Sequence, residues 1–479
     1  MDTAIWWIRR DLRLNDNTAL YAALTTAAIV IPVFILDDRL LHAPRLKGAR
    51  TAWMLQGLQV LDQDIQRLGG RLIVRHGPPV SEMLAVCHES GAAAVFWNRD
   101  YSPYALKRDQ SVRQALNKAG VSTHDFKDLI LHEPNEIPTR TGKPYEVYTP
   151  FSKAWHAVPK PPRLPDLERS ELKRLNPPIG LRSDPLPTPE ELGITAAPAP
   201  IVPPGEKAAL DRLVGFLHQP VYGYKEGRND LPSPATSILS PYLRWGMISP
   251  RVCLGEAQRV LERTPDPEAR GGIVSWISEL IWREFNYSIL INHPRIVRQN
   301  FRPQYDAIQW GNNPQWLDTW QSAQTGYPIV DAAIRQLLEA GWMHNRARMI
   351  VASFLCKDLL IDWRQGEAFF MRHLLDGDLA NNVGGWQWTA GTGTDAAPYF
   401  RIFNPLAQSQ KYDPQGEYIK TYVPALKNVP PAYIHAPHLM PRTLQERTGC
   451  VIGQDYPLPI VHHDQQRPKV LMMYAAART

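Results

Sequence analysis

Apolar and polar positions alternate in blocks over the first 130 residues of the chain. Four short apolar runs are expected to form buried strands: IWWI at 5–8, AIVIPVFIL at 28–36, RLIVR at 71–75 and AAVFW at 93–97. Between them, stretches with helical periodicity predict helices at 49–68, 79–90 and 103–119. Strands that alternate with helices favour a parallel sheet covered by helices, so residues 1–130 are predicted to form a Rossmann-like α/β domain.

The turn after the first expected strand is rich in charged residues. It carries Arg9, Arg10, Asp11, Arg13 and Asn15, and no GxGxxG sequence follows the strand. That glycine pattern is what lets a backbone approach a dinucleotide pyrophosphate. The turn therefore argues against an ordinary dehydrogenase.

The periodicity is lost at residues 131–205, where prolines crowd together (PKPPRLP, NPPIG, DPLPTPEE, APAPIVPPG). Such a segment predicts an irregular linker between domains. From residue 206 to 479 the pattern is helical almost throughout, and the clearest helices are expected at 273–291, 328–340, 344–361 and 365–375. Ser240-Pro241 and Ser249-Pro250 each have the form of an N-cap followed by a first-turn proline. The second domain is predicted to be all-α.

Composition narrows the class of protein. A chain of 479 residues exceeds what one hydrophobic core usually holds, which agrees with two domains. Four scattered cysteines without a CxxC pair predict neither a metal site nor a disulfide framework. The apolar run near the N-terminus is too short, and the residues around it are too charged, for a signal peptide or a membrane span. An intracellular protein without membrane contact is therefore expected. A net charge of +6 permits an anionic partner without requiring one, and 15 tryptophans suit core packing, base stacking or electron transfer equally well.

Four segments carry candidate chemistry. Thr236, Ser237 and Ser240 gather before a helix start, which suits a phosphate, although simple helix capping explains them as well. The next expected helix places Trp276, Glu279, Arg283 and Asn286 on one face. There Glu279 either pairs with Arg283 at the surface or serves as a proton donor or hydrogen-bond partner beside aromatic rings.

The third segment, GWMHNRARMIVASFL, brings Asn345, Arg348 and Met349 to one helix face, where they could contact a planar heteroaromatic ligand, while His344 is expected to be structural. The fourth, DGDLANNVGGWQW at 376–388, is expected to be a turn rather than a helix. Its paired aspartates lack a third ligand at metal-binding spacing, so hydrogen bonding to an organic cofactor fits better than a metal.

These segments together resemble the photolyase and cryptochrome family. The resemblance lies in WIRRDLRLNDNTAL at 7–20 and in ELIWREF, TGYPIVDA, GWMHNR, DGDLANNVGGWQW and RIFNP, in the same order along the chain. It implies a flavoenzyme in which the α/β domain carries an antenna chromophore and the helical domain holds a folded FAD. Within the family, the closest resemblance is to class I photolyases for cyclobutane pyrimidine dimers.

The resemblance also implies a set of residues around the cofactor. Asn382 would face flavin N5, and the remaining contacts would come from Tyr224, Thr236, Ser237, Ile238, Leu239, Ser240, Trp276, Arg348, Asp376 and Asp378. Three tryptophans would carry electrons from the surface to the flavin, namely Trp310, Trp363 and Trp386.

The implied reaction is light-driven repair, in which excited reduced FAD passes an electron to the dimer and receives it back, so the enzyme would be a carbon-carbon lyase. The lesion would be flipped out of the DNA stack into the site. Glu279, Asn345, Asn382 and Met349 would act at the lesion or the flavin. DNA would be contacted by Arg228, Trp276, Glu279, Arg283, Asn345, Arg346, Trp388, Arg401 and Gln408.

Two related activities are weighed against this one. A cryptochrome-type photoreceptor is disfavoured by Asn382, by Glu279 and by the short segment after the last expected helix; a (6-4) photolyase is disfavoured because Asn345 and Met349 stand where that branch has a histidine pattern. The antenna is expected to be methenyltetrahydrofolate or 8-hydroxy-5-deazaflavin, and Lys47, Asp100 and Tyr101 are weak candidates for its site. A cytoplasmic monomer associated with the nucleoid through its DNA substrate is expected.

Overall fold

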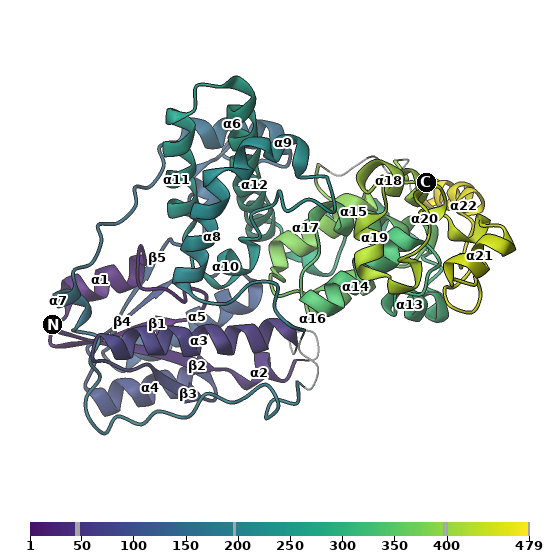
Figure 1. The fold of residues 1–479 in the computed structure, drawn as a ribbon. Coiled ribbons are helices and arrows are strands. Elements are labelled where there is room, and N and C mark those ends of the chain that lie inside the picture. Colours follow the sequence, from purple (N-terminus) through teal and green to yellow (C-terminus); the bar gives the residue numbers. More distant parts are fainter. Residues whose placement is uncertain (44–47, 195–197, 396–397, 399–400, 478–479) are drawn as a thin grey trace.

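The computed structural model describes residues 1–43, 48–194, 198–395, 398 and 401–477. The N-terminal part is built on one five-stranded sheet whose strands follow the order β3-β2-β1-β4-β5 (Figure 1). The strands are β1 (Thr3–Ile8), β2 (Ile29–Leu36), β3 (Ile73–His76), β4 (Ala94–Asn98) and β5 (Ser122–Phe126). All neighbouring strands are parallel, which confirms the predicted α/β domain. Strand β5 was not predicted, because its sequence, STHDF, lacks the apolar run of the other four strands.

Successive side chains of β1 serve the two faces of the sheet. Trp6 packs in the large core that includes α1 (Thr18–Thr26) and α3 (Ala49–Arg67). Trp7 packs in a separate core with α4 (Pro79–Ser90) and α5 (Pro103–Lys118). The helices expected at 49–68, 79–90 and 103–119 are therefore confirmed, and the sheet is covered on both faces.

The proline-rich segment is more ordered than its sequence suggests. It contains α6 (Tyr148–Ala157) and the single-turn α7 (Arg169–Leu172), so the prediction of an irregular linker is only partly right. Helix α6 packs on α12 (Pro267–Asn292), where the indole Nε1 of Trp155 donates to the carboxylate of buried Glu284 at 2.6 Å. The domain limits at 130 and 205 remain predictions.

Beyond residue 205, helices α8 to α12 stand over the sheet domain, and α13 to α22 form a second group beside them (Figure 1). The bounds are α8 Glu206–His218, α9 Tyr224–Gly227, α10 Ser240–Trp245, α11 Pro250–Arg263, α12 Pro267–Asn292, α13 Pro314–Gln321, α14 Pro328–Ala340, α15 Asn345–Ser353, α16 Trp363–His373, α17 Leu379–Ala390, α18 Pro405–Tyr412, α19 Glu417–Tyr422, α20 Pro431–Ile434, α21 Arg442–Thr448 and α22 His463–Ala476. The predicted all-α domain is confirmed. Across the described ranges, no helix is both long and apolar enough to span a membrane.

Three local predictions in this half need correction. The segment 376–388 is helical from Leu379 onward, because Asp378 caps α17 by accepting from the amide of Asn381 at 3.1 Å. The helix expected at 344–361 changes to a π-helical turn at Phe354–Asp358. Ser249 caps α11 as predicted, whereas Ser240 is the first residue of α10 and makes no cap hydrogen bond.

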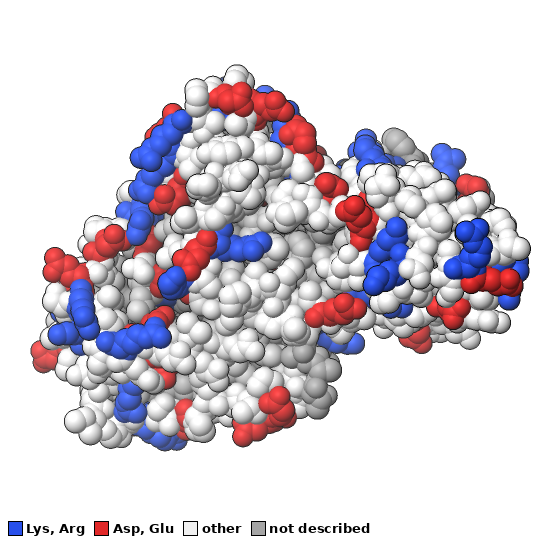
Figure 2. Space-filling model, in the orientation of Figure 1, with Lys and Arg blue, Asp and Glu red and all other residues white. Residues whose placement is uncertain are grey.

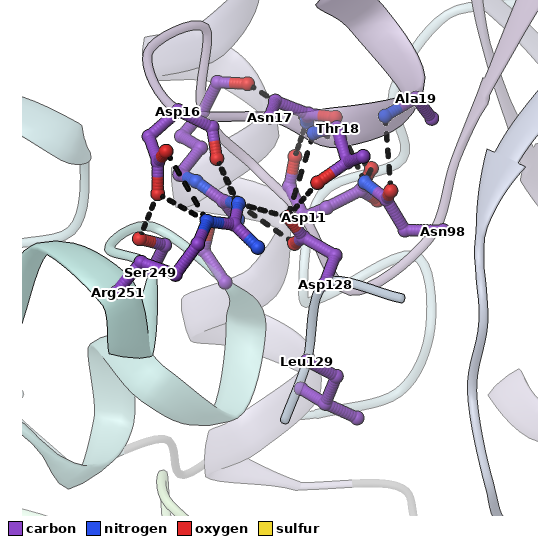
Figure 3. A network of polar contacts seen from close by, with 12 residues as sticks. Asp11, Asp16, Asn17, Thr18, Ala19, Asn98, Asp128, Leu129, Ser249 and Arg251 are labelled. Carbon is purple, nitrogen blue, oxygen red and sulfur yellow. Dashed lines mark hydrogen bonds and ion pairs between the residues drawn. The ribbon is translucent and has the colours of Figure 1, made fainter. Parts of the chain in front are cut away.

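A buried ionic network joins the two domains (Figure 3). Arg251 of α11 contacts Asp128 at 2.6 Å and Asp16 at 3.0 Å, and Arg13 contacts Asp128 at 2.7 Å. None of the four side chains exposes more than 4% of its surface. The charged turn after β1, which the sequence made conspicuous, thus connects the sheet to the helical domain.

Candidate functional site

An ion pair between α15 and the turn before α17 anchors the candidate site. Arg348 donates to Asp376 Oδ2 at 2.8 Å and to the Met343 carbonyl at 2.8 Å. The other carboxylate oxygen, Asp376 Oδ1, is buried and has no hydrogen-bond partner among the described residues. Buried acceptors are nearly always satisfied, so this oxygen calls for a donor from a bound molecule. Two of the predicted cofactor residues are therefore together, with one acceptor left over.

The predicted phosphate loop lies close to the aromatic face of α12. Trp276 Nε1 donates to Ser237 Oγ at 3.2 Å, and Arg212 holds the Ser237 carbonyl at 2.7 Å. Within the described ranges, the backbone amides of residues 236–239 donate to no protein group. Ile238 has a φ of 49°, which turns the loop sharply. Free, neighbouring N–H groups of this kind suit a phosphate or pyrophosphate.

Asn382, in the first turn of α17, is fixed by Glu367 of α16. Its Nδ2 donates to the Glu367 side chain at 2.9 Å and to the Glu367 carbonyl at 3.1 Å. Because the amide nitrogen is used in this way, the amide oxygen is the atom left for a ligand, and it can only accept. Asn382 is thus oriented to receive a hydrogen bond from a donor such as a protonated ring nitrogen.

Asp378 does not fit its predicted role as a direct cofactor ligand. Oδ2 accepts from Arg10 and from the Tyr287 hydroxyl, and Oδ1 accepts from the backbone and side-chain nitrogens of Asn381. These four bonds use the acceptor positions of a carboxylate. The residue acts instead at the domain contact and at the cap of α17.

Glu279 pairs with a different arginine from the one suggested by helical spacing. Its carboxylate forms an ion pair with Arg228, whereas Arg283 donates to the Leu129 carbonyl at 2.7 Å. Burial raises the pKa of Glu279, although Arg228 acts in the opposite direction. The alternative of a Glu279–Arg283 pair is therefore wrong. Arg283 contacts the first domain through Leu129, and its DNA contact stays a prediction.

Helix α15 presents its first turn to solvent beside this pair. Asn345 is exposed and Met349 is half-buried. Arg346 donates to Asn229 at 2.7 Å and lies 4.4 Å above the Tyr412 ring. His344 caps the helix through Nδ1, and burial lowers its pKa to about 4, which keeps the ring neutral. His344 is structural, as expected.

Of the three predicted electron-transfer tryptophans, Trp386 and Trp363 are buried and Trp310 is partly exposed. Trp386 and Trp363 expose 2% and 0% of their surface, and Trp310 is half-buried. The Trp363 indole is held by Asn300 at 2.9 Å, and the Trp310 ring lies 6.2 Å from that of Tyr474. This order suits a path from the interior toward the surface.

The other predicted DNA contacts lie on α17, on α18 and between them. Trp388 and Gln408 are half-buried, and Arg401 is exposed. On the face in Figure 2, basic and acidic side chains alternate around a largely uncharged centre.

Two predicted cofactor residues are buried: Tyr224 packs against Phe216 at a ring distance of 5.9 Å, and Leu239 is also buried. In the described part of the chain, no cluster of His, Cys, Asp and Glu could hold a metal ion.

Comparison with known proteins shows the family to which the chain belongs. Residues 4–168 match the family model described as DNA photolyase, and residues 276–476 match the one described as the FAD binding domain of DNA photolyase. A deoxyribodipyrimidine photo-lyase of Agrobacterium fabrum is 40% identical over 99% of this chain and 98% of its own length. The chain belongs to the DNA photolyase family.

Solved structures of the photolyase family and its relatives have the same fold. A class III photolyase from Agrobacterium tumefaciens is 38% identical, with a TM-score of 0.88 over 100% of this chain and 98% of the other. A Synechocystis cryptochrome is 30% identical, with a TM-score of 0.88 over 99% of both chains. An archaeal photolyase from Sulfolobus tokodaii with two FAD molecules is 30% identical, with a TM-score of 0.81 over 99% of this chain and 100% of the other.

The two antenna candidates that the structure describes in this photolyase-family chain, Asp100 and Tyr101, lie in different surroundings. Asp100 forms an ion pair with Arg10 at 3.1 Å in the domain contact. Tyr101 donates to Glu133 at 2.7 Å and lines an open pocket of about 440 Å³ together with Asn135 and Asn292. Lys47 lies outside the described residues. Of the two candidates that the structure describes, Tyr101 is the one that lines this pocket.

Sequence reasoning missed several residues that orient the site. Glu367 and Asn229 hold predicted site residues by hydrogen bonds, and Tyr412 lies under Arg346. Arg10 was noticeable in the charged turn, but nothing in the sequence linked it to Asp378, 368 residues away. Such partners become visible only when distant helices are brought together.

Proposed function

We propose that this protein repairs cyclobutane pyrimidine dimers in DNA by light-driven electron transfer from reduced FAD. The observation that carries the proposal is the arrangement of α15 and α17, which pack against each other while α17 also packs on α12. It contains the Arg348–Asp376 pair, an oriented Asn382 and the unpartnered Asp376 Oδ1. The membership of the DNA photolyase family supports the same reaction.

The donor and acceptor set fits FAD. The free amides of residues 236–239 would hold the phosphates, with Tyr224 and Ser240 beside them. Asp376 Oδ1 would accept from the cofactor, and the Asn382 oxygen would accept from N5 of the flavin ring when that nitrogen carries a proton. When bound and reduced, FAD supplies on excitation the electron that opens the cyclobutane ring and takes it back afterwards.

The protein positions the lesion through Glu279 and Asn345. Glu279 is held by Arg228, and its raised pKa means that less energy is needed to protonate it next to a bound base. Asn345 is exposed in the first turn of α15 and can donate and accept at once. Trp276, Trp388 and Met349 would supply apolar surface for the flipped pyrimidines, since a damaged pair is cheaper to unstack.

The flanking DNA backbone would be held by Arg228, Arg346 and Arg401, with Gln408 nearby. Arg346 is already directed by Asn229 and by the Tyr412 ring, so little side-chain entropy is lost when it meets a phosphate. Phosphate contacts fix the register on the duplex without reading its sequence. Recognition would therefore depend on the lesion itself.

Trp386, Trp363 and Trp310 would return the flavin to its reduced state by passing electrons inward from the surface. Two buried rings followed by the partly exposed Trp310 support that direction of transfer. A second chromophore would collect light for the flavin, and the pocket beside Tyr101 is the place we assign to it. Folate and deazaflavin both remain candidates for its identity.

A repair assay tests the proposal. The reduced, flavin-loaded protein is illuminated with near-UV light on one oligonucleotide with a cyclobutane thymine dimer and on another with a (6-4) photoproduct. We expect light-dependent repair of the first and none of the second, with no repair in darkness. Repair of the (6-4) lesion alone would reassign the substrate. Repair of neither lesion by protein with bound reduced FAD would overturn the proposal in favour of a photoreceptor.

A further inference from the structure

Arg10 connects four segments of the molecule at the domain contact. It lies two residues beyond the end of β1, and its side chain exposes only 11% of its surface. Its guanidinium donates to Asp100 at 3.1 Å, to the Arg244 carbonyl at 3.1 Å, to the Tyr287 hydroxyl at 2.8 Å and to Asp378 at 2.7 Å. One side chain of the sheet domain thereby holds residues of α10, α12 and the start of α17.

The bond to Asp378 reaches the helix that carries Asn382. Asp378 Oδ1 accepts from the Asn381 amide at 3.1 Å, and the Asp378 carbonyl accepts from the Asn382 amide at 2.8 Å. Asn381 is in turn tied to Asn286 of α12 at 3.0 Å. Any shift of Asp378 therefore moves the first turn of α17, where Asn382 lies.

The turn before α17 is also held by two other arginines. The Gly377 carbonyl accepts from Arg50 of α3 at 2.8 Å and from Arg244 of α10 at 2.8 Å. Burial opposes the ionisation of Asp378, but Arg10 and Arg244 outweigh it and hold the pKa of this carboxyl well below its usual range. Asp378 thus stays charged and attached to Arg10 at neutral pH.

We propose that Arg10, a residue of the sheet domain, is a positioning residue for the flavin: by holding Asp378 it fixes the first turn of α17 and so the place of Asn382 opposite N5. This inference rests on the proposed function, because it assumes that Asn382 contacts the cofactor. It assigns the sheet domain a second task beside carrying an antenna. That task is to set the stability of the reduced flavin through α17.

The test uses Arg10→Gln in the flavin-loaded protein, with Arg251→Gln as matched control. Arg251 also makes a buried ionic bridge between the domains, but its carboxylate partners, Asp16 and Asp128, lie outside α17. Two readouts are needed: hydrogen–deuterium exchange of the amides in the first turn of α17, and the rate at which air oxidises the reduced flavin in the dark. Both measurements are independent of repair.

We expect Arg10→Gln to raise exchange at Asn381 and Asn382 roughly tenfold, as for the loss of a helix cap, and to accelerate air oxidation several-fold. Arg251→Gln is expected to lower the stability of the protein while leaving both readouts near wild type. Arg10→Lys, which keeps the charge but cannot make four bonds at once, should lie between wild type and Arg10→Gln. It serves as the decisive variant if Arg10→Gln does not fold.

Unchanged exchange and oxidation in the Arg10 variants would overturn the inference, as would equal changes in Arg251→Gln. Wild-type protein that repairs dimers while the Arg10 variants behave normally would remove only this inference. Wild-type protein that takes up no FAD would instead remove the proposed function.

Discussion

Replacement of Asp128 by asparagine should destabilise the contact between the two domains strongly. Asp128 exposes 2% of its side chain and accepts from Arg251 (Figure 3) and also from Arg13. Burial opposes its ionisation, but the two arginines outweigh that effect and lower its pKa to about 2. Asparagine has nearly the same shape and removes only the negative charge. Arg251 would then keep the carboxylate of Asp16, whereas Arg13 would be left with the Asp16 backbone carbonyl and no carboxylate partner.

The magnitude follows from two independent considerations. Lowering a carboxyl pKa from 3.8 to about 2 corresponds to roughly 2.5 kcal/mol of stability at pH 7. Removing one partner of a buried ion pair costs about 3–5 kcal/mol, because the remaining charge is left without compensation. The variant also leaves an excess positive charge inside the protein. We therefore expect a loss of about 3–5 kcal/mol in the free energy of unfolding.

Urea unfolding followed by tryptophan fluorescence and circular dichroism measures this loss. The matched control is Asp166→Asn, since Asp166 pairs with Arg163 at the surface with 73% of its side chain exposed. Such an exposed pair contributes about 0–1 kcal/mol. A loss below about 1 kcal/mol for Asp128→Asn, or one equal to that of the control, would refute the reasoning.

The pH dependence provides a second check of the same carboxyl. A group whose pKa is lower in the folded state stabilises the fold above its unfolded pKa and loses that contribution as the pH falls through the folded value. For Asp128 this window extends from about pH 4 down to about pH 2. Asp128→Asn should therefore lose less stability than wild type over this interval, and parallel curves for the two proteins would contradict the assignment.

Three further variants test the site. Glu279→Ala should lower the repair yield roughly tenfold while the flavin content stays unchanged, since a hydrogen bond to a charged group is lost; loss of flavin would mean that Glu279 is misplaced. Asn382→Asp should change which flavin redox state persists in air, and an unchanged absorption spectrum would remove Asn382 from N5. Trp363→Phe should slow light-driven reduction of oxidised flavin but leave repair by chemically reduced protein intact; normal photoreduction would exclude Trp363 from the electron path.

Local sequence patterns predicted most of the elements, because burial on one face leaves a periodic trace. The helix at 328–340 and the strand at 29–36 follow directly from such patterns. Strand β5 escaped prediction because an edge strand with polar residues carries no such trace. Helix α17 was not predicted because its glycines and asparagines disfavour a helix locally. Its N-cap, Asp378, is held by Arg10, which is distant in the sequence.

The residue set of the candidate site stays a prediction, and its internal arrangement could not be predicted from the sequence. The resemblance to a known family supplied Arg348, Asp376 and Asn382, whereas their orientation depends on side chains far away in sequence. Asp378 shows the difference most clearly. The sequence motif groups it with Asp376, but in the structure Asp378 pairs with Arg10 whereas Asp376 pairs with Arg348. The role of a charged residue in a turn cannot be predicted from the sequence when its partner lies in another domain.

The central claim is that reduced FAD, bound by the helical domain, is the source of the repairing electron. Its most direct test removes the flavin, reloads the protein in steps and measures repair of a thymine-dimer oligonucleotide per flash of light at each occupancy. Repair should be absent from the stripped protein and should rise in proportion to the bound reduced flavin. Repair that persists without flavin, or fully loaded reduced protein that repairs nothing, would contradict the account.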